Sequence, residues 1–212
     1  MNKKAKRATN EVADLTSRGA QRRDDLVKAT IRIIVRHGPA AVSLREVAKE
    51  ASASHGLVAY YFGTRSALMV AAIEYVCEYI ATTFAEIIPD LEAAARNPSR
   101  FAAVLARYNI DRVMNHPDIG LALYEVNIAG IREPGLRPVL LKWGKVHASL
   151  CKKAFTTLGS KNPEEDYAFL LNSIAGLILG QSVLPRRKFE DKIFMPAVER
   201  LVYSILRAGN SK

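Results

Sequence analysis

Helical periodicity, interrupted repeatedly by proline and glycine, is the feature that most limits the folds open to this 212-residue chain. In nearly every long segment apolar residues recur at the spacing of an α-helix, and no segment alternates convincingly like a strand. Dipeptides such as Gly38-Pro39 and His116-Pro117 end one segment before the next begins. The predicted helices cover residues 21–37, 44–50, 55–61, 64–88, 98–115, 118–130, 136–158, 163–183 and 191–207. We therefore predict an all-α fold of about nine helices.

Positive charge is concentrated near the amino terminus. The chain has a net charge of +10 and a pI near 9.7. Residues 1–65 hold 13 basic against 6 acidic residues, whereas residues 66–212 hold 18 against 15. Such a segment favours nucleic acid, anionic lipid or another polyanion as a partner. A charged run is often only a solvated surface, so a motif must accompany the charge before it indicates function.

Neither secretion nor a membrane span is indicated. The first twenty residues lack the apolar core of a secretory signal and are interpreted as a basic flexible arm. The most apolar run, residues 169–185, is interrupted by Asn172, Ser173, Gln181 and Ser182 and is too short for a bilayer. We expect a cytoplasmic protein without a membrane partner.

Catalytic and metal-binding residue types do not cluster at a telling spacing. Cys77 and Cys151 lie far apart and predict neither a disulfide framework nor a zinc site. His147 and Cys151 are four residues apart on one helical face, but two ligands do not make a metal site. No Ser/His/Asp set or carboxylate cluster indicates catalysis, so we expect no enzyme, metal or cofactor.

Two short capped helices in tandem form the most informative motif. Ser43 can cap the segment 44–50, and Glu46 completes a capping box. Ser54 can cap the next segment after a tight turn, and Thr64 the long helix that follows. A longer amphipathic helix precedes the pair. This arrangement predicts a helix-turn-helix, whose second helix would enter the major groove of DNA.

The residues of this motif follow one another in a specific order. They read Ser43-Leu44-Arg45-Glu46-Val47-Ala48, then Ala51-x-Ala53-Ser54-x-Gly56, then Tyr60-Tyr61-Phe62-Gly63-x-Arg65-x-x-Leu68. This order resembles the N-terminal signature of the tetracycline-repressor (TetR) family over residues 22–72. The resemblance implies a DNA-binding head, a divergent helical remainder that binds a small inducer, and a homodimer formed by the last two long helices.

The chain departs from the family pattern at three positions. Ser52 stands where the family usually has glycine, at a turn that favours a left-handed backbone. Ala59 replaces a tyrosine that often touches phosphate in the family, so Tyr60 or Tyr61 would take that role. Arg65 replaces the usual lysine and offers phosphate a bidentate fork.

The predicted DNA contacts are residues of the helix-turn-helix and its flanks. They are Ser43, Arg45, Ser54, His55, Gly56, Leu57, Tyr60, Tyr61, Thr64 and Arg65. Arg45 is the candidate base contact, ideally to guanine. The hydroxyl-bearing caps are candidate phosphate contacts, which position a protein without reading sequence. The basic residues of the arm, such as Lys3 and Arg7, either contact DNA or have no fixed structure.

Candidate ligand contacts are the polar and aromatic residues of the later helices. They are Tyr108, Arg112, His116, Tyr124, Asn127, Trp143, His147 and Asn172. For each of them an ordinary place in the core remains the alternative. The apolar run Leu170–Leu179, with Val198, Leu201, Val202 and Ile205, predicts a dimer surface, and packing within one chain is its alternative.

Three regions follow from these interpretations. Residues 1–21 form the flexible arm, 22–67 the DNA-binding domain, and 68–212 the ligand-binding and dimerisation domain. We expect a homodimeric regulator, most simply a repressor, that releases a palindromic double-stranded DNA operator when a small molecule binds the C-terminal bundle. A DNA-bound adaptor or structural protein that recruits a protein partner without an inducer remains the alternative.

Overall fold

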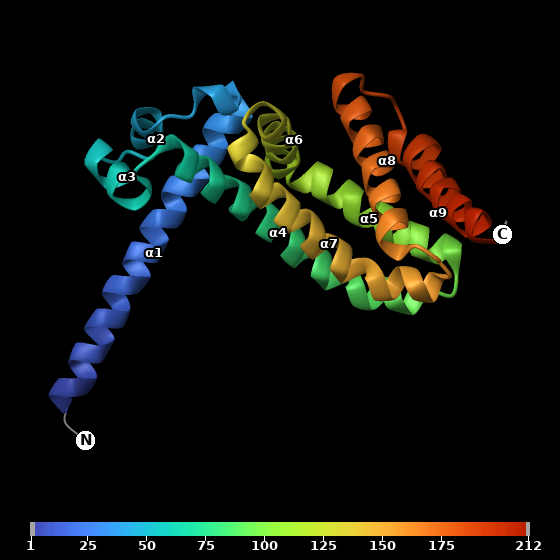
Figure 1. Cartoon of the computed structure of the whole chain (residues 1–212), viewed down its shortest axis with the longest axis horizontal. Coiled ribbons are helices and arrows are strands. Elements are labelled where there is room, and N and C mark those ends of the chain that lie inside the picture. Colours follow the sequence, from blue (N-terminus) through green and yellow to red (C-terminus); the bar gives the residue numbers. More distant parts are fainter. Residues whose placement is uncertain (1–2, 211–212) are drawn as a thin grey trace. The chain divides into compact units, whose positions relative to one another are not determined.

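The structure is a computed structural model that describes the backbone of residues 3–210 and the side chains of residues 17–112 and 116–207. Within these residues all regular structure is helical (Figure 1), which confirms the predicted fold class. The helices are α1 (Lys3–His37), α2 (Leu44–Glu50), α3 (His55–Phe62), α4 (Arg65–Ala94), α5 (Pro98–Asn115), α6 (Pro117–Arg132), α7 (Arg137–Leu158), α8 (Pro163–Val183) and α9 (Met195–Asn210). Two short 3-10 turns, Pro39–Ala41 and Pro134–Leu136, and a π-helical turn, Glu190–Phe194, connect some of them.

Two compact units share this chain. The N-terminal unit consists of residues 1–76 and 121–140, and the C-terminal unit of residues 77–120 and 141–212. The helices α4, α6 and α7 each contain residues of both units. The predicted DNA-binding domain ends at residue 67. In the structure, residues 68–76 and 121–140 belong to the same compact unit as the amino-terminal helices.

In the N-terminal unit, α2 and α3 pack on one another, and α2 also packs on α1 (Figure 1). The predicted stripe of α1 is buried, including Leu26, Ile33 and Ile34. Val47 of α2 and Val58 of α3 are completely buried beside it. Burying side chains of this size stabilises a fold by about 1.5–3 kcal/mol each, so these short helices depend on packing more than on their own propensity.

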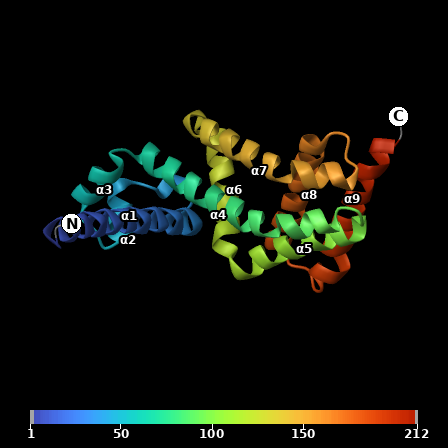
Figure 2. The ribbon, with the colours of Figure 1, turned by 90° about the horizontal axis from the view of Figure 1, so that it is seen from below.

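In the C-terminal unit, α5 runs along α9, and α8 also contacts α9 (Figure 2). Phe101 of α5 and Phe155 of α7 meet edge to face, with ring centroids 5.4 Å apart. Val198, Val202 and Ile205 of α9 are buried within the same chain. For these three residues packing within one chain is therefore observed, whereas Leu201 is half-buried and Tyr203 exposed, so a dimer surface on α9 stays a prediction.

Two helices extend beyond their predicted ends by more than three residues. Helix α1 begins at Lys3, so the predicted flexible arm is helical over its described backbone, while the side chains of its predicted contacts lie outside the described residues. Helix α4 continues through Pro89 to Ala94. A proline inside a helix costs about 3 kcal/mol. Complete burial of Leu91 and near-complete burial of Ala94 and Ala95 offset this cost.

Helix α4 is long and apolar enough to cross a membrane by length and composition alone. Half of its most apolar window is buried inside the protein. Leu68, Met69 and Ile73 of this helix are completely buried. A core helix of a soluble protein has these same properties, so this feature is weak evidence for a membrane span.

Candidate functional site

Hydroxyl caps begin the helices of the predicted DNA-binding motif. The Ser43 hydroxyl accepts from the amide of Glu46, and the Ser54 hydroxyl accepts from the amide of Leu57, each over 3.1 Å. Thr64 accepts from the amide of Ala67 over the same distance. The three predicted hydroxyl caps are confirmed, whereas among the described residues the Glu46 carboxylate does not bind back to the Ser43 amide, so the predicted capping box is only half formed. A hydroxyl that accepts in this way still has its own hydrogen to donate, for example to a phosphate oxygen.

The turn between α2 and α3 needs a left-handed backbone, which Ser52 supplies with φ 48°. Non-glycine residues rarely adopt this conformation, because Cβ crowds the backbone. The amide of Ala53 closes the turn by donating to the carbonyl of Ala48 over 2.8 Å. The turn keeps its geometry although the family's usual glycine is absent.

One edge of α3 is open to solvent. His55, Gly56 and Tyr60 are exposed, and Tyr60 has an exposed fraction of 81%. A Cβ atom added to Gly56 would meet no atom within 4 Å, so no packing contact in the described residues requires glycine at this position. Large exposed aromatics and helical glycines both cost stability or solubility. Their coincidence at one helix edge indicates a surface that receives a partner.

The opposite edge of α3 is anchored in the core. Val58 and Phe62 are buried, and the guanidinium of Arg23 on α1 lies 5.2 Å from the centre of the Phe62 ring. Tyr61 is half-buried and meets Tyr60 edge to face at 5.2 Å. Leu57 is also half-buried. Tyr61 and Leu57 therefore contribute mainly to docking α3, whereas Tyr60 does not.

The two arginines predicted to contact DNA have different surroundings. Arg45 is exposed on the first turn of α2. Arg65 is held inside the N-terminal unit: its Nε donates to the carbonyl of Val42 over 3.1 Å and its Nη2 to the carbonyl of Pro39 over 2.9 Å. Its two terminal nitrogens also bind the Glu133 carboxylate over 2.7 and 3.0 Å.

Arg65 therefore connects three segments of the N-terminal unit: α4, the 3-10 turn after α1, and the turn after α6. The hydrogen bond and charge of Glu133 raise the pKa of Arg65, and Arg65 lowers the pKa of Glu133. The phosphate contact predicted for Arg65 would require this bidentate ion pair to open. Sequence reasoning missed Glu133, because the pair joins residues 68 positions apart.

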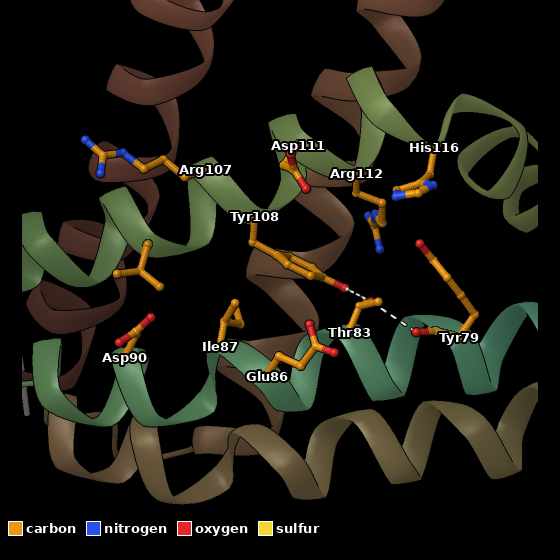
Figure 3. Close-up of a pocket in the computed structure, with 11 residues that line it drawn as sticks. Tyr79, Thr83, Glu86, Ile87, Asp90, Arg107, Tyr108, Asp111, Arg112 and His116 are labelled. Atoms are coloured by element: carbon orange, nitrogen blue, oxygen red, sulfur yellow. Dashed lines mark hydrogen bonds between the residues drawn. The ribbon is translucent and has the colours of Figure 1, made fainter.

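A cavity of about 570 Å³ lies between α4 and α5 in the C-terminal unit. Its lining residues are Tyr79, Thr83, Glu86, Ile87, Asp90, Val104, Arg107, Tyr108, Asp111, Arg112 and His116. This volume lies within the range of small-molecule sites. Figure 3 shows the hydroxyl of Tyr79 pointing toward Arg112 and His116 at one end, with Asp90 at the other. The structure thus brings together Tyr108, Arg112 and His116 among the predicted ligand contacts.

Internal hydrogen bonds fix one wall of this cavity. The Tyr108 and Thr83 hydroxyls lie 3.1 Å apart, and Tyr108 donates to the carbonyl of Ile80 over 3.3 Å. The guanidinium of Arg112 lies 5.5 Å from the centre of the Tyr108 ring and donates to Asn109 Oδ1 over 3.1 Å. Both side chains are therefore held in place without a ligand.

Three buried nitrogens in the C-terminal unit have no hydrogen-bond partner among the described residues. They are Nε of Arg112, Nε1 of Trp143 and Nε2 of His147. A buried donor left unpaired costs about 1–3 kcal/mol, and more when it is charged. Burial is the main reason that the pKa of His147 lies below its usual value; a hydrogen bond of the ring to the backbone of Cys77 raises the pKa in part, and the charge of Arg112 lowers it further. His147 is thus electrostatically coupled to Arg112, and its ring centre lies 6.2 Å from that of Trp143.

The other predicted ligand contacts lie elsewhere. Tyr124 and Asn127 belong to the N-terminal unit, and the Asn127 amide donates to the carbonyl of Leu123 over 2.7 Å. Asn172 is exposed on α8. None of the three lines the cavity between α4 and α5.

Helix α8 exposes a row of apolar side chains, which we call the α8 face: Phe169, Leu179 and Val183. Leu171 is also exposed but lies on another side of the helix. Gly176 and Gly180 lie among them, and a Cβ atom at either glycine would meet no atom within 4 Å. Leu170, Ile174 and Ile178 point the other way and are buried. The predicted dimer surface is therefore open on one side of α8 only.

Both cysteines are buried in the C-terminal unit, and burial raises the pKa of each thiol from 9.0 to about 12. Since the thiolate is the reactive form, we expect both to react with Ellman's reagent about 1,000-fold more slowly in the folded protein than in guanidinium chloride. Rapid reaction of either thiol with the folded protein would contradict this burial. Among the described residues no group of three or more potential metal ligands forms a site.

Comparison with known proteins places these features in a family. Residues 26–72 match the family model described as "Bacterial regulatory proteins, tetR family", and residues 96–208 match "Tetracyclin repressor-like, C-terminal domain". The second match alone covers more than half of the chain. It spans α5 to α9, whereas the first spans the helix-turn-helix.

Individual relatives of the chain support the same family. The chain is 30% identical over 164 residues to the HTH-type transcriptional regulator BetI of Burkholderia mallei (strain NCTC 10229), covering 74% of this chain and 80% of that protein. It is similar to the multidrug binding protein EbrR complexed with ethidium, with 26% identity, a TM-score of 0.67 and coverage of 85% and 97%. A transcriptional regulator from Rhodococcus sp. Rha1 shares the fold, with a TM-score of 0.69, 19% identity and coverage of 88% and 96%. The chain therefore belongs to the tetR family of bacterial regulatory proteins and is a ligand-responsive DNA-binding transcriptional regulator.

Proposed function

We propose that this protein is a homodimeric cytoplasmic repressor that binds a palindromic operator through α3 and releases it when a small molecule fills the cavity between α4 and α5. The exposed edge of α3, formed by His55, Gly56 and Tyr60, is the observation that carries the proposal. An edge of this kind lets a helix approach base edges in the major groove.

The remaining predicted contacts are assigned by their exposure. Arg45 is the proposed base contact, because it is exposed and has a guanidinium that can bind guanine with two hydrogen bonds. Ser43, Ser54 and Thr64 are proposed phosphate contacts through their hydroxyl hydrogens. Leu57 and Tyr61 support α3, and Arg65 holds the motif together from inside.

The α8 face is the proposed dimer surface. A row of exposed apolar residues beside two glycines allows close approach of a second helix, and a twofold interface presents the same surface from each copy. A dimer would place two α3 helices on the two halves of a palindrome. Helix α4 contains both Arg65 and the cavity residues Tyr79 and Thr83, so it is the proposed link between effector and operator.

Binding to DNA from upstream of the protein's own gene tests the proposal. We expect fluorescence anisotropy to detect a site bound at least about 1,000-fold more tightly than random duplex, with affinity falling steeply as salt rises. If no duplex in that region is bound more tightly than random DNA, the proposed operator function is wrong.

Arg45→Ala is expected to weaken operator binding by about 5- to 150-fold, which corresponds to about 1–3 kcal/mol for a lost bidentate base contact. Its exposed position predicts an unchanged melting temperature. Lys49→Ala, exposed on the same helix, is the matched control and should cost only a few-fold. Equal effects of the two substitutions would argue against base recognition by Arg45.

Gly56→Ala is expected to leave the folded protein at least as stable, because the added methyl group meets no atom within 4 Å. If the edge of α3 approaches DNA closely, the same methyl group should weaken operator binding at least about tenfold. Gly120→Ala on α6 also adds a methyl group in open space and should leave binding unchanged. Anisotropy and thermal melting of both variants make the comparison, and normal binding by Gly56→Ala would contradict close approach.

A further inference from the structure

Two of the three unpaired nitrogens of the C-terminal unit, Nε of Arg112 and Nε1 of Trp143, can only donate hydrogen bonds. His147 donates through its other ring nitrogen to the backbone of Cys77, so Nε2 of the neutral ring is an acceptor. Buried donors are almost always paired in folded proteins, and exceptions call for a functional explanation. The two donors therefore lack an acceptor among the described residues.

Arg112 is the member of this set that lines the cavity. Among the described residues its guanidinium forms no ion pair with a carboxylate; its partners are the neutral amide of Asn109 and the ring of Tyr108. A half-buried cation without a counter-ion attracts an anion more strongly than an exposed cation does, because solvent screens it less. The terminal N–H groups of its guanidinium can donate to the two oxygens of a carboxylate.

The cavity also has acidic residues, which could favour a cation instead. Glu86, Asp90 and Asp111 line it, but all three are exposed. Water and salt screen exposed carboxylates, so their attraction for a bound cation is weak. Arg112 is less exposed to solvent than the three carboxylates, so its charge is screened less. We therefore expect the cavity to prefer an anion to a cation.

The rest of the lining suits an aromatic body. Tyr79, Ile87, Val104 and Tyr108 provide apolar and aromatic surface between α4 and α5. Figure 3 shows the ring of Tyr108 extending across the cavity toward Thr83, with Arg112 beside its hydroxyl end. A flat ring held against this surface would direct a carboxylate at Arg112.

We propose that the effector is an aromatic or similarly apolar carboxylate, whose oxygens are bound by Arg112. The inference depends on the proposed function, since it names the class of molecule that fills the same cavity. It sets this chain apart from EbrR, which has been crystallised with ethidium, a cation.

Three probes of one shape test the preference: naphthalene-2-carboxylate, its carboxamide and the corresponding methylammonium compound. Isothermal titration calorimetry on the full-length protein should give a dissociation constant at least tenfold lower for the carboxylate than for either of the others.

Arg112→Met keeps the length of the side chain and removes its charge and donors, so it should abolish the preference for the carboxylate. Arg112→Lys keeps the charge without the fork and should retain part of the preference. Arg100→Met, on the same helix but exposed and outside the cavity, is the matched control and should bind as the natural protein does. Melting curves confirm that each variant is folded.

Equal affinities, a preference for the ammonium compound, no binding of any probe up to about 1 mM, or an unchanged preference in Arg112→Met would each overturn the inference. Operator binding by the same preparations separates this failure from that of the proposed function. If the operator is bound specifically but the carboxylate is not preferred, only the effector class is wrong. If the carboxylate is preferred and no operator is bound specifically, the effector class stands and the repressor proposal falls.

Discussion

Arg65→Ala is expected to lower the free energy of unfolding of the N-terminal unit by about 2 to 3 kcal/mol. The substitution removes two hydrogen bonds to the carbonyls of Pro39 and Val42, each contributing about 1 kcal/mol, and an ion pair with Glu133. Because both side chains of the pair are about one-third exposed, at 35% and 37%, the ion pair itself adds only about 0.5–1 kcal/mol. Urea unfolding followed by circular dichroism measures the loss.

Glu133→Gln separates the ion pair from the carbonyl contacts. It should cost less than Arg65→Ala, because the hydrogen bonds of Arg65 to Pro39 and Val42 remain. Since Arg65 lowers the pKa of Glu133, the pair contributes its full stability above the ordinary carboxyl pKa and loses it as the pH falls through the lower folded value. The natural protein should therefore approach Glu133→Gln in stability in acid. If Arg65→Ala has the same free energy of unfolding as the natural protein, the hydrogen bonds and ion pair of Arg65 do not contribute to stability.

The structural role of Arg65 affects how a loss of DNA binding in Arg65→Ala can be interpreted. A loss of operator binding in Arg65→Ala does not by itself identify a phosphate contact, because the motif it supports is weakened at the same time. Arg45 is exposed, so its substitution has no such ambiguity. The two arginines should be replaced separately, and stability should be measured for each.

Leu179→Glu is expected to convert the protein to a monomer and to weaken operator binding at least about 100-fold. The substitution puts a charge in the middle of the α8 face, next to Gly180, where a twofold interface would bring two such charges together. Loss of the dimer uncouples the two half-sites and removes the gain from joint binding, which is about 100- to 10,000-fold. Analytical ultracentrifugation and anisotropy measure the two effects.

Leu141→Glu is the matched control for this prediction. Leu141 is an exposed leucine of the C-terminal unit on α7, outside the α8 face. Its substitution should leave both the oligomeric state and operator binding unchanged. A dimeric Leu179→Glu with natural affinity would place the dimer surface elsewhere.

Local signals made much of the helix-turn-helix predictable. Ser43, Ser54 and Thr64 act through hydrogen bonds to residues three positions away, so their capping roles can be read from neighbouring residues. Gly63 and the left-handed turn at Ser52 are equally local. For this reason the predicted bounds of α2 agree with the structure, and those of α3 differ by one residue.

Long-range packing explains most of what could not be predicted. The partner of Arg65 is 68 residues away, and no periodicity links the two positions. The apolar residues of α9 have the pattern expected of either a core or a dimer surface, and only their contact with α5 identifies them as core. Pro89 normally predicts a helix end, yet burial of residues beyond it continues α4.

The proline within α4 bears on how selective the cavity can be. Pro89 has no amide hydrogen, so the carbonyl four residues earlier lacks its usual helical partner. Glu86, Ile87 and Asp90 line the cavity on both sides of that missing bond. A helix segment with one fewer backbone hydrogen bond bends at a lower energetic cost, so this side of the cavity can adjust to ligands of different size. Bending at this point would let one regulator bind several related carboxylates of different size, while Arg112 binds the carboxylate group of each.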